Sequence, residues 1–325
     1  MYKLNEEINT GQLKQIYLLC GEEDYLRKQY RDRLKKAFLG DGDAMNYHYF
    51  EGKDVSVSEV IDLAETMPFL SECRVIVLDN TLLFKSGGER LAEYVASPAE
   101  TVRLVFVEKE IDRRSRLYKA VTANGRAVEF QIQDEKTLKK WILGMLKKEK
   151  KNITAQDLEY FLEKTGTSME TISKELEKLL CYCIDRDVIT KEDIDGICSR
   201  QINNQIFEML NAIAEKRQQD AMNLYYDLLM LKEPAMKILV LLGKQFAILM
   251  QVKELKRKGY DNKSIGEIIK RSASNTRKFI SQADRFSDSV LRQALNDCVE
   301  AQEAIITGKM DEIMSVELLL IRYST

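Results

Sequence analysis

Five short strand-like segments alternate with helical segments over residues 1–135, and this alternation limits the folds open to the chain. Three of them are continuous apolar runs of the kind found in strands buried on both faces of a sheet. The five are Ile16–Cys20, Asn46–Phe50, Arg74–Asp79, Arg103–Val107 and Ala127–Phe130. Helical periodicity lies between them, for example over Tyr25–Phe38, where every fourth residue is apolar. We therefore expect an α/β domain with a parallel sheet and right-handed crossovers.

Beyond this domain the pattern is helical, so the expected fold class is α/β plus all-α. A small helical domain is predicted over residues 136–204, with a capping box at Thr154–Asp157 and a capped short helix that starts at Thr190–Asp193. A second helical domain is predicted over residues 205–325, with helices near 204–217, 219–231, 234–258, 273–286, 288–306 and 310–322. Ile238–Leu242 is apolar on more than one face, which is typical of the central helix of a bundle or of one that contacts a neighbouring subunit.

The turn after the first strand lacks the residues that bind nucleotide phosphates. At this junction many α/β domains place free backbone amides and a lysine, often in the pattern GxxxxGK[ST]. This chain has Gly21 followed by Glu22, Glu23 and Asp24, and the pattern occurs nowhere in its sequence. Three carboxylates would repel a triphosphate. The sequence therefore indicates a nucleotide-binding scaffold without a nucleotide site.

The amino-acid composition excludes several kinds of protein and of functional site. The net charge is −2 and 45% of residues are hydrophobic, which indicates real cores and no bulk basic charge. No signal-peptide core and no apolar run of membrane-spanning length is evident, so we expect a cytoplasmic protein without a membrane partner. The six cysteines show no zinc spacing and are expected to be reduced. His48 is the single histidine and lies in a strand-like segment, which disfavours a catalytic triad or a histidine metal site.

Several stretches together resemble one family. Leu18–Leu26 contains Gly-Glu-Glu followed by an aromatic residue and leucine, Glu65–Val77 places an apolar pair before a strand led by arginine, and Asp112–Lys119 precedes the last strand. Asp311–Leu320, near the end of the printed sequence, is a fourth stretch that resembles the same family. In order and spacing these stretches resemble the bacterial DNA polymerase III delta subunit, a component of the clamp loader, over the whole chain.

This resemblance implies an AAA+-like fold and a mechanical role in DNA replication. The expected domains are a clamp-binding α/β domain (1–135), a helical lid (136–204) and a helical collar for assembly (205–325). The implied partners are the beta sliding clamp, the tau/gamma and delta prime subunits, and primer–template DNA within the complex. The family's clamp-binding position corresponds to Met67, Pro68, Phe69 and Leu70. No catalytic residue, cofactor or metal is expected, and DNA-directed DNA polymerase activity would belong to the holoenzyme.

Alternatives remain open at this point. Phe69 and Leu70 could instead pack on the helix that ends at Thr66. Asp79 could hold magnesium as in a Walker B strand, although a remnant of an ATPase scaffold is favoured. Arg116 could act as an arginine finger, although a solvated helix face is favoured. An active AAA+ ATPase and a metal-dependent nucleotidyl transferase are the alternative functions.

Two basic clusters could contact DNA phosphates. For the first, a solvated face is the favoured interpretation; it comprises Lys139, Lys140, Lys147, Lys148, Lys150 and Lys151. The second lies in the expected collar, and DNA contact there is left open; it comprises Lys270, Arg271, Arg277 and Lys278.

Overall fold

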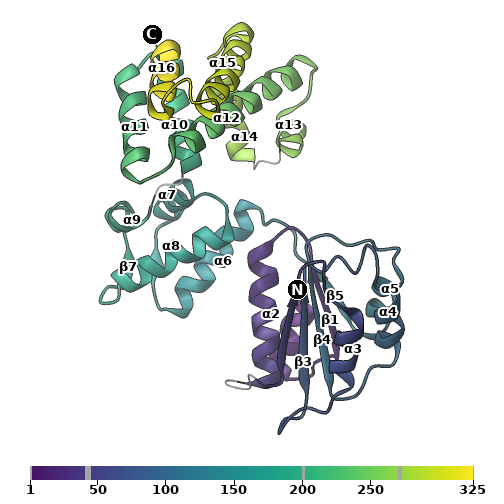
Figure 1. The fold of residues 1–325 in the computed structure, drawn as a ribbon. Coiled ribbons are helices and arrows are strands. Elements are labelled where there is room, and N and C mark those ends of the chain that lie inside the picture. Colours follow the sequence, from purple (N-terminus) through teal and green to yellow (C-terminus); the bar gives the residue numbers. More distant parts are fainter. Residues whose placement is uncertain (1, 41–44, 200–201, 270–272, 325) are drawn as a thin grey trace. The chain divides into compact units, whose positions relative to one another are not determined.

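The computed structural model describes residues 2–40, 45–199, 202–269 and 273–324. It divides into two compact units, Met1–Gln133 and Asp134–Thr325, which we describe separately (Figure 1). The first is the expected α/β domain and the second is the helical part. A division of the helical part into lid and collar near residue 204 stays a prediction.

The first unit contains a five-stranded parallel sheet in the order β2-β3-β4-β1-β5. The strands are β1 (Ile16–Cys20), β2 (Tyr47–Glu51), β3 (Arg74–Asp79), β4 (Val102–Glu108) and β5 (Arg126–Glu129). In β1, Leu18 pairs with Phe106 of β4 on one side and with Ala127 of β5 on the other. The fold class predicted from the sequence is therefore confirmed, and the strand limits agree with those expected or differ by one residue.

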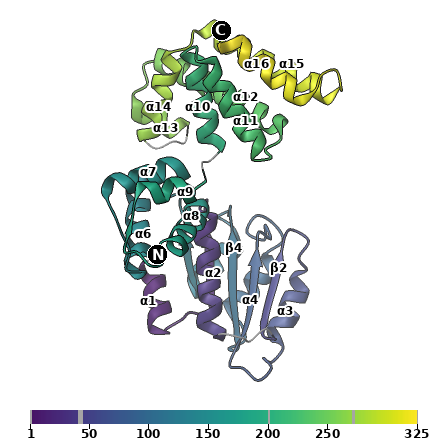
Figure 2. The same ribbon diagram turned by 90° about the vertical axis from the view of Figure 1, so that its left-hand side faces the viewer.

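Helices cover both faces of this sheet (Figures 1 and 2). They are α1 (Tyr2–Thr10), α2 (Asp24–Leu39), α3 (Val57–Glu65), α4 (Glu89–Ala96) and α5 (Arg116–Asn124). Buried residues of α3, α4 and α5 share one core with alternate residues of the strands, whereas Tyr30 of α2 packs on Phe130 on the other face. Sequence reasoning missed α1, whose Glu7 forms an ion pair with Arg126 of β5 at 2.5 Å.

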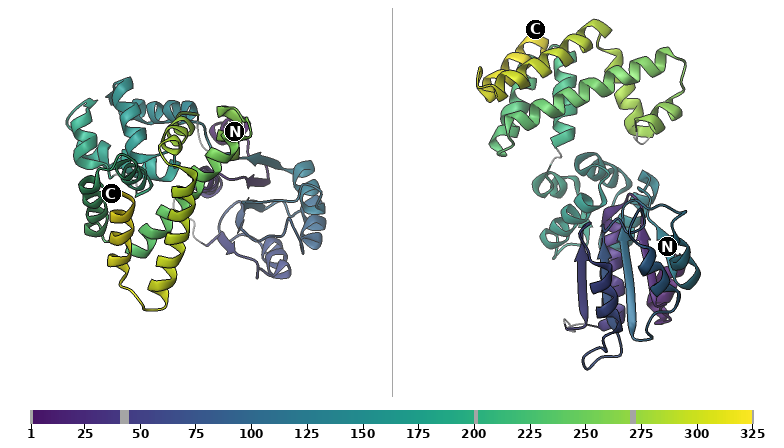
Figure 3. Two further views of the ribbon diagram at one scale, coloured as in Figure 1. Left: turned by 90° about the horizontal axis from the view of Figure 1, so that it is seen from above. Right: turned by 45° about the vertical axis from the view of Figure 1, so that its right-hand side comes forward.

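The second unit is almost entirely helical. Its elements are α6 (Glu135–Lys148), β6 (Asn152–Ile153), α7 (Ala155–Thr165), α8 (Met169–Tyr182), β7 (Val188–Ile189), α9 (Lys191–Ile197), α10 (Ile202–Ala214), α11 (Gln218–Met230), α12 (Ala235–Arg257), α13 (Asn262–Ile268), α14 (Ala273–Asp284), α15 (Asp288–Ile306) and α16 (Glu312–Ser324). The short parallel pair β6–β7 and helix α13 were not predicted. Figure 3 shows α15 and α16 as neighbours at the carboxyl end of the chain.

The predicted capping box at Thr154 and the predicted helix cap at Thr190 had different outcomes. Thr190 and Asp193 form the complete reciprocal box at the start of α9. At the start of α7, the Thr154 hydroxyl accepts from the Asp157 amide, but the Asp157 carboxylate bonds that hydroxyl rather than the Thr154 backbone. The box predicted at Thr154 is therefore only half formed.

Helix α12 is the central helix of the C-terminal bundle, as the Ile238–Leu242 pattern predicted. Ile238, Leu242 and Leu249 are buried, and the helix packs against α10, α14, α15 and α16. By length and composition alone it is also apolar enough to cross a membrane. The expectation that no apolar run reaches such a length was therefore wrong. The bundle core accounts for this apolar character, because a central helix must bury more than one face.

Candidate functional site

The turn between β1 and α2 has its backbone amides engaged within the domain. The Gly21 amide donates to the Glu108 carbonyl at 3.2 Å, and the Glu23 amide donates to the Phe130 carbonyl at 3.0 Å. Gly21 has a φ of 118°, and a Cβ there would lie 2.3 Å from the Phe130 oxygen, so glycine is required for this close approach. Amides that cradle phosphates in nucleotide-binding domains are thus bonded to protein acceptors here.

The side chains at this turn also disfavour a bound anion. Asp24 forms ion pairs with Arg27 at 2.8 Å and Lys28 at 2.7 Å. Burial raises the pKa of the Glu23 carboxyl, which accepts from the Tyr25 amide at 3.3 Å. Arg27 is buried, and its Nε and Nη1 have no hydrogen-bond partner. Arg27 and Lys28 together do not balance the three carboxylates of Glu22, Glu23 and Asp24, so the turn keeps an excess of negative charge.

Asp79, at the end of β3, has partners from its own domain. Its Oδ2 accepts from the Tyr49 hydroxyl at 2.8 Å and lies 3.4 Å from Arg31 Nη1, and its Oδ1 accepts from Nδ2 of the Asn80 side chain at 2.9 Å. Among the described residues there is no cluster of three or more histidine, cysteine or acidic side chains that could hold a metal ion. This arrangement fits the interpretation of Asp79 as a remnant of an ATPase scaffold.

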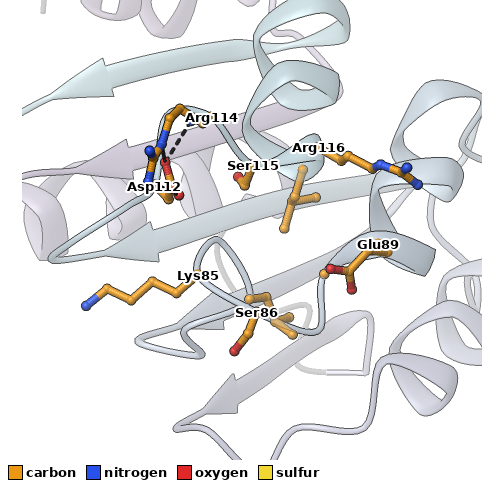
Figure 4. Close-up of a pocket in the computed structure, with 10 residues that line it drawn as sticks. Lys85, Ser86, Glu89, Asp112, Arg114, Ser115 and Arg116 are labelled. Carbon is orange, nitrogen blue, oxygen red and sulfur yellow. Dashed lines mark hydrogen bonds and ion pairs between the residues drawn. The ribbon is translucent and has the colours of Figure 1, made fainter.

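Arg116 lines a pocket of about 410 Å³ between the starts of α4 and α5 (Figure 4). The neighbouring arginines are engaged locally: Arg114 pairs with Asp112 at 3.1 Å, and Arg113 pairs with Glu129 at 2.7 Å. Arg116 extends over the pocket from the first turn of α5, on the side where Glu89 also lies. The pocket is lined by charges of both signs, so it has no consistent preference for an anion.

A different part of the domain presents apolar side chains to solvent. The connection between α3 and β3 contains Met67, Pro68, Phe69 and Leu70, which we call the apolar loop. Phe69 is 58% exposed and Leu70 is 92% exposed. The alternative that this pair packs back on α3 is therefore wrong. The loop precedes β3, whereas the Gly21 turn follows β1. Because these strands are parallel, the loop lies at the amino-terminal end of the strands and the Gly21 turn lies at their carboxyl-terminal end.

Two buried polar side chains hold the backbone of the apolar loop. The Asn46 side chain donates to the Phe69 carbonyl and accepts from the Phe69 amide, both at 2.8 Å. Arg74 Nη2 donates to the Met67 carbonyl at 2.9 Å, and its Nη1 lies 3.5 Å from His48 Nε2. Sequence reasoning missed the role of Asn46, although a polar residue directly before a strand is a signal. The loop backbone is thus fixed while its apolar side chains remain exposed.

Backbone strain accompanies this arrangement. Leu70 has a φ of 50°, in the left-handed region that non-glycine residues seldom adopt. Such a conformation costs on the order of 1–3 kcal/mol and persists only where the surroundings impose it. The bonds from Asn46 and Arg74 supply that constraint on the residues just before Leu70.

The four predicted DNA contacts are not brought together among the described residues. Lys270 and Arg271 lie outside the described residues. On α14, Arg277 is exposed, and Lys278 forms an ion pair with Glu163 of α7 at 2.7 Å. DNA contact by this cluster stays a prediction.

Two sequence-family models match the chain. One is described as "DNA polymerase III, delta subunit" and matches residues 17–131, and the other is its C-terminal domain and matches residues 203–323. The chain belongs to the DNA polymerase III delta subunit family. Both matches agree with the resemblance found in the sequence, and together they cover more than two thirds of the chain.

Individual delta-family proteins are similar over three quarters or more of the chain. "DNA polymerase III subunit delta" of Bacillus subtilis is 26% identical over 330 residues, which cover 98% of this chain and 95% of the relative. "Probable DNA polymerase III subunit delta" of Aquifex aeolicus is 23% identical over 269 residues, 78% of this chain and 75% of the relative. A solved structure described as "Bacillus subtilis DNA clamp loader delta protein" matches with a TM-score of 0.75 and 24% identity, over 99% of each chain. This last match supports the AAA+-like fold.

Proposed function

We propose that this chain is the clamp-binding subunit of a clamp loader, and that it binds the sliding clamp through the apolar loop. The observation that carries this proposal is the exposure of Phe69 and Leu70 on a backbone held by Asn46 and Arg74. Large apolar residues that stay in water contribute nothing to their own core. Aromatic and aliphatic side chains of this kind are typical anchors for a pocket on a partner.

The fixed backbone supports the same conclusion on energetic grounds. A loop that is ordered before binding does not lose backbone entropy on association, a cost of about 1–2 kcal/mol per residue. The strain at Leu70 is a cost borne by the free domain, and the two hydrogen bonds from Asn46 offset part of it. A partner pocket next to the intersubunit interface of the clamp would therefore bind the loop without a further cost of ordering its backbone. Tighter binding to the open ring than to the closed ring would then favour opening.

The proposed role requires no catalysis by this chain. The acidic turn with engaged amides supports the proposal that ATP is bound and hydrolysed by other subunits, namely tau/gamma with delta prime in the complex. Polymerase activity would likewise belong to the holoenzyme. A cytoplasmic location and the absence of a membrane partner follow from this role.

Assembly with the other subunits is proposed to use the C-terminal bundle. Helices α11 and α16 contact each other and leave large apolar side chains exposed, including Met230, Met314 and Leu318. Exposed apolar residues gathered on neighbouring helices are typical of interfaces between proteins. Primer–template DNA would be met within the assembled complex.

The test is a surface-binding measurement with the organism's own sliding clamp. Phe69→Ala with Leu70→Ala should weaken binding by about 30- to 1,000-fold, since truncating central anchors costs on the order of 2–4 kcal/mol. Tyr182→Ala with Ile184→Ala is the matched control, because these side chains are 56% and 71% exposed in the second unit. The control should bind normally.

Melting temperatures of both variants complete the test. The Phe69/Leu70 variant should melt close to the wild type, because residues exposed in the free chain contribute little to its stability. Unchanged clamp affinity of this variant would overturn the proposed function. Lost affinity together with a collapsed melting temperature would also count against it, because the loss would then reflect unfolding.

A further inference from the structure

Helix α6 carries a strong local excess of positive charge. Its fourteen residues include five lysines and one glutamate, in a chain whose net charge is −2. The structure separates the lysines of this region into those used within the unit and those that are not. Only the second kind can contribute to binding a partner.

Two lysines of this region have structural roles. Lys139 forms ion pairs with Glu135 at 3.1 Å and Glu159 at 3.2 Å. Lys151 donates to three backbone carbonyls beyond the end of α8, at 2.6–2.9 Å; these belong to Cys183, Ile184 and Arg186. Both lysines are therefore engaged within the unit and are not available to a ligand.

Three other lysines form an exposed row. Lys136, Lys140 and Lys147, which we call the lysine row, are exposed and form no ion pair with any described carboxylate. At 3.6 residues per turn they lie within about 40° of one another around the helix axis. Between them lie Leu143 and Gly144, and Gly144 has open space where a Cβ would be.

An acidic residue lies near one end of the row. The pKa of the Asp134 carboxyl is lowered first by its hydrogen bonds to Thr137 and then by the charges of Lys136 and Lys140. This carboxylate caps the helix and is fully exposed, so water and salt screen its effect on the lysines. The row therefore keeps an excess positive charge along its length.

We propose that the lysine row binds the sugar–phosphate backbone of DNA, independently of clamp binding by the apolar loop. Eleven residues of helix rise about 16 Å, which matches the axial rise of about five nucleotides of one strand. A straight row of unpaired like charges suits a phosphate chain, which offers negative charges at a regular spacing. The absent side chain at Gly144 allows a backbone to approach the helix closely.

Other partners fit this face less well. Protein interfaces are depleted in lysine and enriched in aromatic residues, and the row contains no aromatic side chain. A helix lying on a membrane inserts its apolar face into the lipid. The apolar face of α6 is occupied instead, since Leu138, Ile142 and Leu146 are buried.

The test uses the full chain and a fluorescently labelled DNA with a duplex and a single-stranded arm, followed by anisotropy over a range of salt. The variant is Lys136→Gln, Lys140→Gln and Lys147→Gln. The matched control is Lys244→Gln, Lys263→Gln and Lys309→Gln, which removes three exposed lysines elsewhere in the same unit. We expect the variant to lose affinity by on the order of tenfold or more at low salt, with a salt slope reduced by about 2 to 3 for duplex.

The affinity of the triple lysine variant for the clamp should not change. This measurement separates DNA binding by the lysine row from clamp binding by the apolar loop. The proposal is overturned if the wild type fails to bind this DNA at low salt, if the variant matches the wild type, or if the control loses as much affinity as the variant. It is also overturned if the variant loses binding to clamp, to partner subunits or to phosphatidylserine vesicles while DNA binding is unchanged.

Discussion

Asn46→Ala should loosen the apolar loop without removing any side chain that the loop presents. Asn46 is fully buried, and two hydrogen bonds at 2.8 Å join its side chain to the backbone of Phe69. At about 0.5–1.5 kcal/mol for each bond, their loss should reduce the free energy of unfolding by about 1–3 kcal/mol. The chain should still fold, because no core side chain is lost.

The effect on clamp binding follows from the regained freedom of the loop. If Phe69 and Leu70 must be ordered again on binding, the cost of about 1–2 kcal/mol per residue, or about 2–4 kcal/mol for the pair, weakens affinity by about 30- to 1,000-fold. Amide hydrogen exchange at Phe69 should become faster, because its amide no longer donates to the Asn46 side chain. Both changes should be measured on the same protein preparation, with affinity from surface binding to the clamp.

Asn204→Ala is the matched control for this prediction. Its side-chain amide donates to the carbonyls of Glu163 and Lys164 in the second unit, so the change also removes two side chain–backbone bonds. Clamp affinity should be unaffected. Faster exchange at Phe69 with unchanged clamp affinity of Asn46→Ala would refute the reasoning that a fixed loop backbone matters for binding.

Three further predictions concern other parts of the chain. The purified chain should show no saturable binding of ATP by calorimetry, because the acidic Gly21–Asp24 turn has its amides engaged; micromolar affinity would contradict this. A fragment ending near Arg200 should bind the clamp but fail to co-elute with tau/gamma and delta prime, and full-length behaviour would count against assembly through the bundle. Burial raises the pKa of Glu108, so this carboxyl favours the folded state most at low pH and loses that contribution as pH rises through its folded pKa. Thermal melts between about pH 4 and 8 should therefore show Glu108→Gln gaining stability relative to the wild type as pH rises, and a constant difference would argue against it.

Much of the fold was predictable because its signals are local. The strands β1 and β3 are continuous apolar runs, and their limits agree with those expected. Long amphipathic helices such as α15 (Asp288–Ile306) were also placed correctly. The misses are short or depend on distant partners. Only Leu4 of α1 is buried, and the helix is held by the ion pair of Glu7 with Arg126, more than a hundred residues away.

The candidate site was predictable in position but not in structure. The resemblance placed clamp binding at Met67–Leu70, whereas sequence reasoning alone favoured packing of Phe69 and Leu70 on the preceding helix. Exposure of these side chains depends on the hydrogen bonds from Asn46, which lies 23 residues earlier in the chain. A helical or strand period in the sequence carries no information on such a contact between two loops. The same limit applies to the lysine row, since only the structure distinguishes paired from unpaired lysines on α6.

The central claim is that this chain binds the sliding clamp through the apolar loop and favours its open form. The most direct test is a clamp labelled with a donor and an acceptor dye across one subunit interface, mixed with excess chain in the absence of nucleotide. Energy transfer should fall with the wild type and with Tyr182→Ala/Ile184→Ala, and should stay at the level of the free clamp with Phe69→Ala/Leu70→Ala. An equal fall in energy transfer with the Phe69/Leu70 variant, or no fall with the wild type, would contradict the claim.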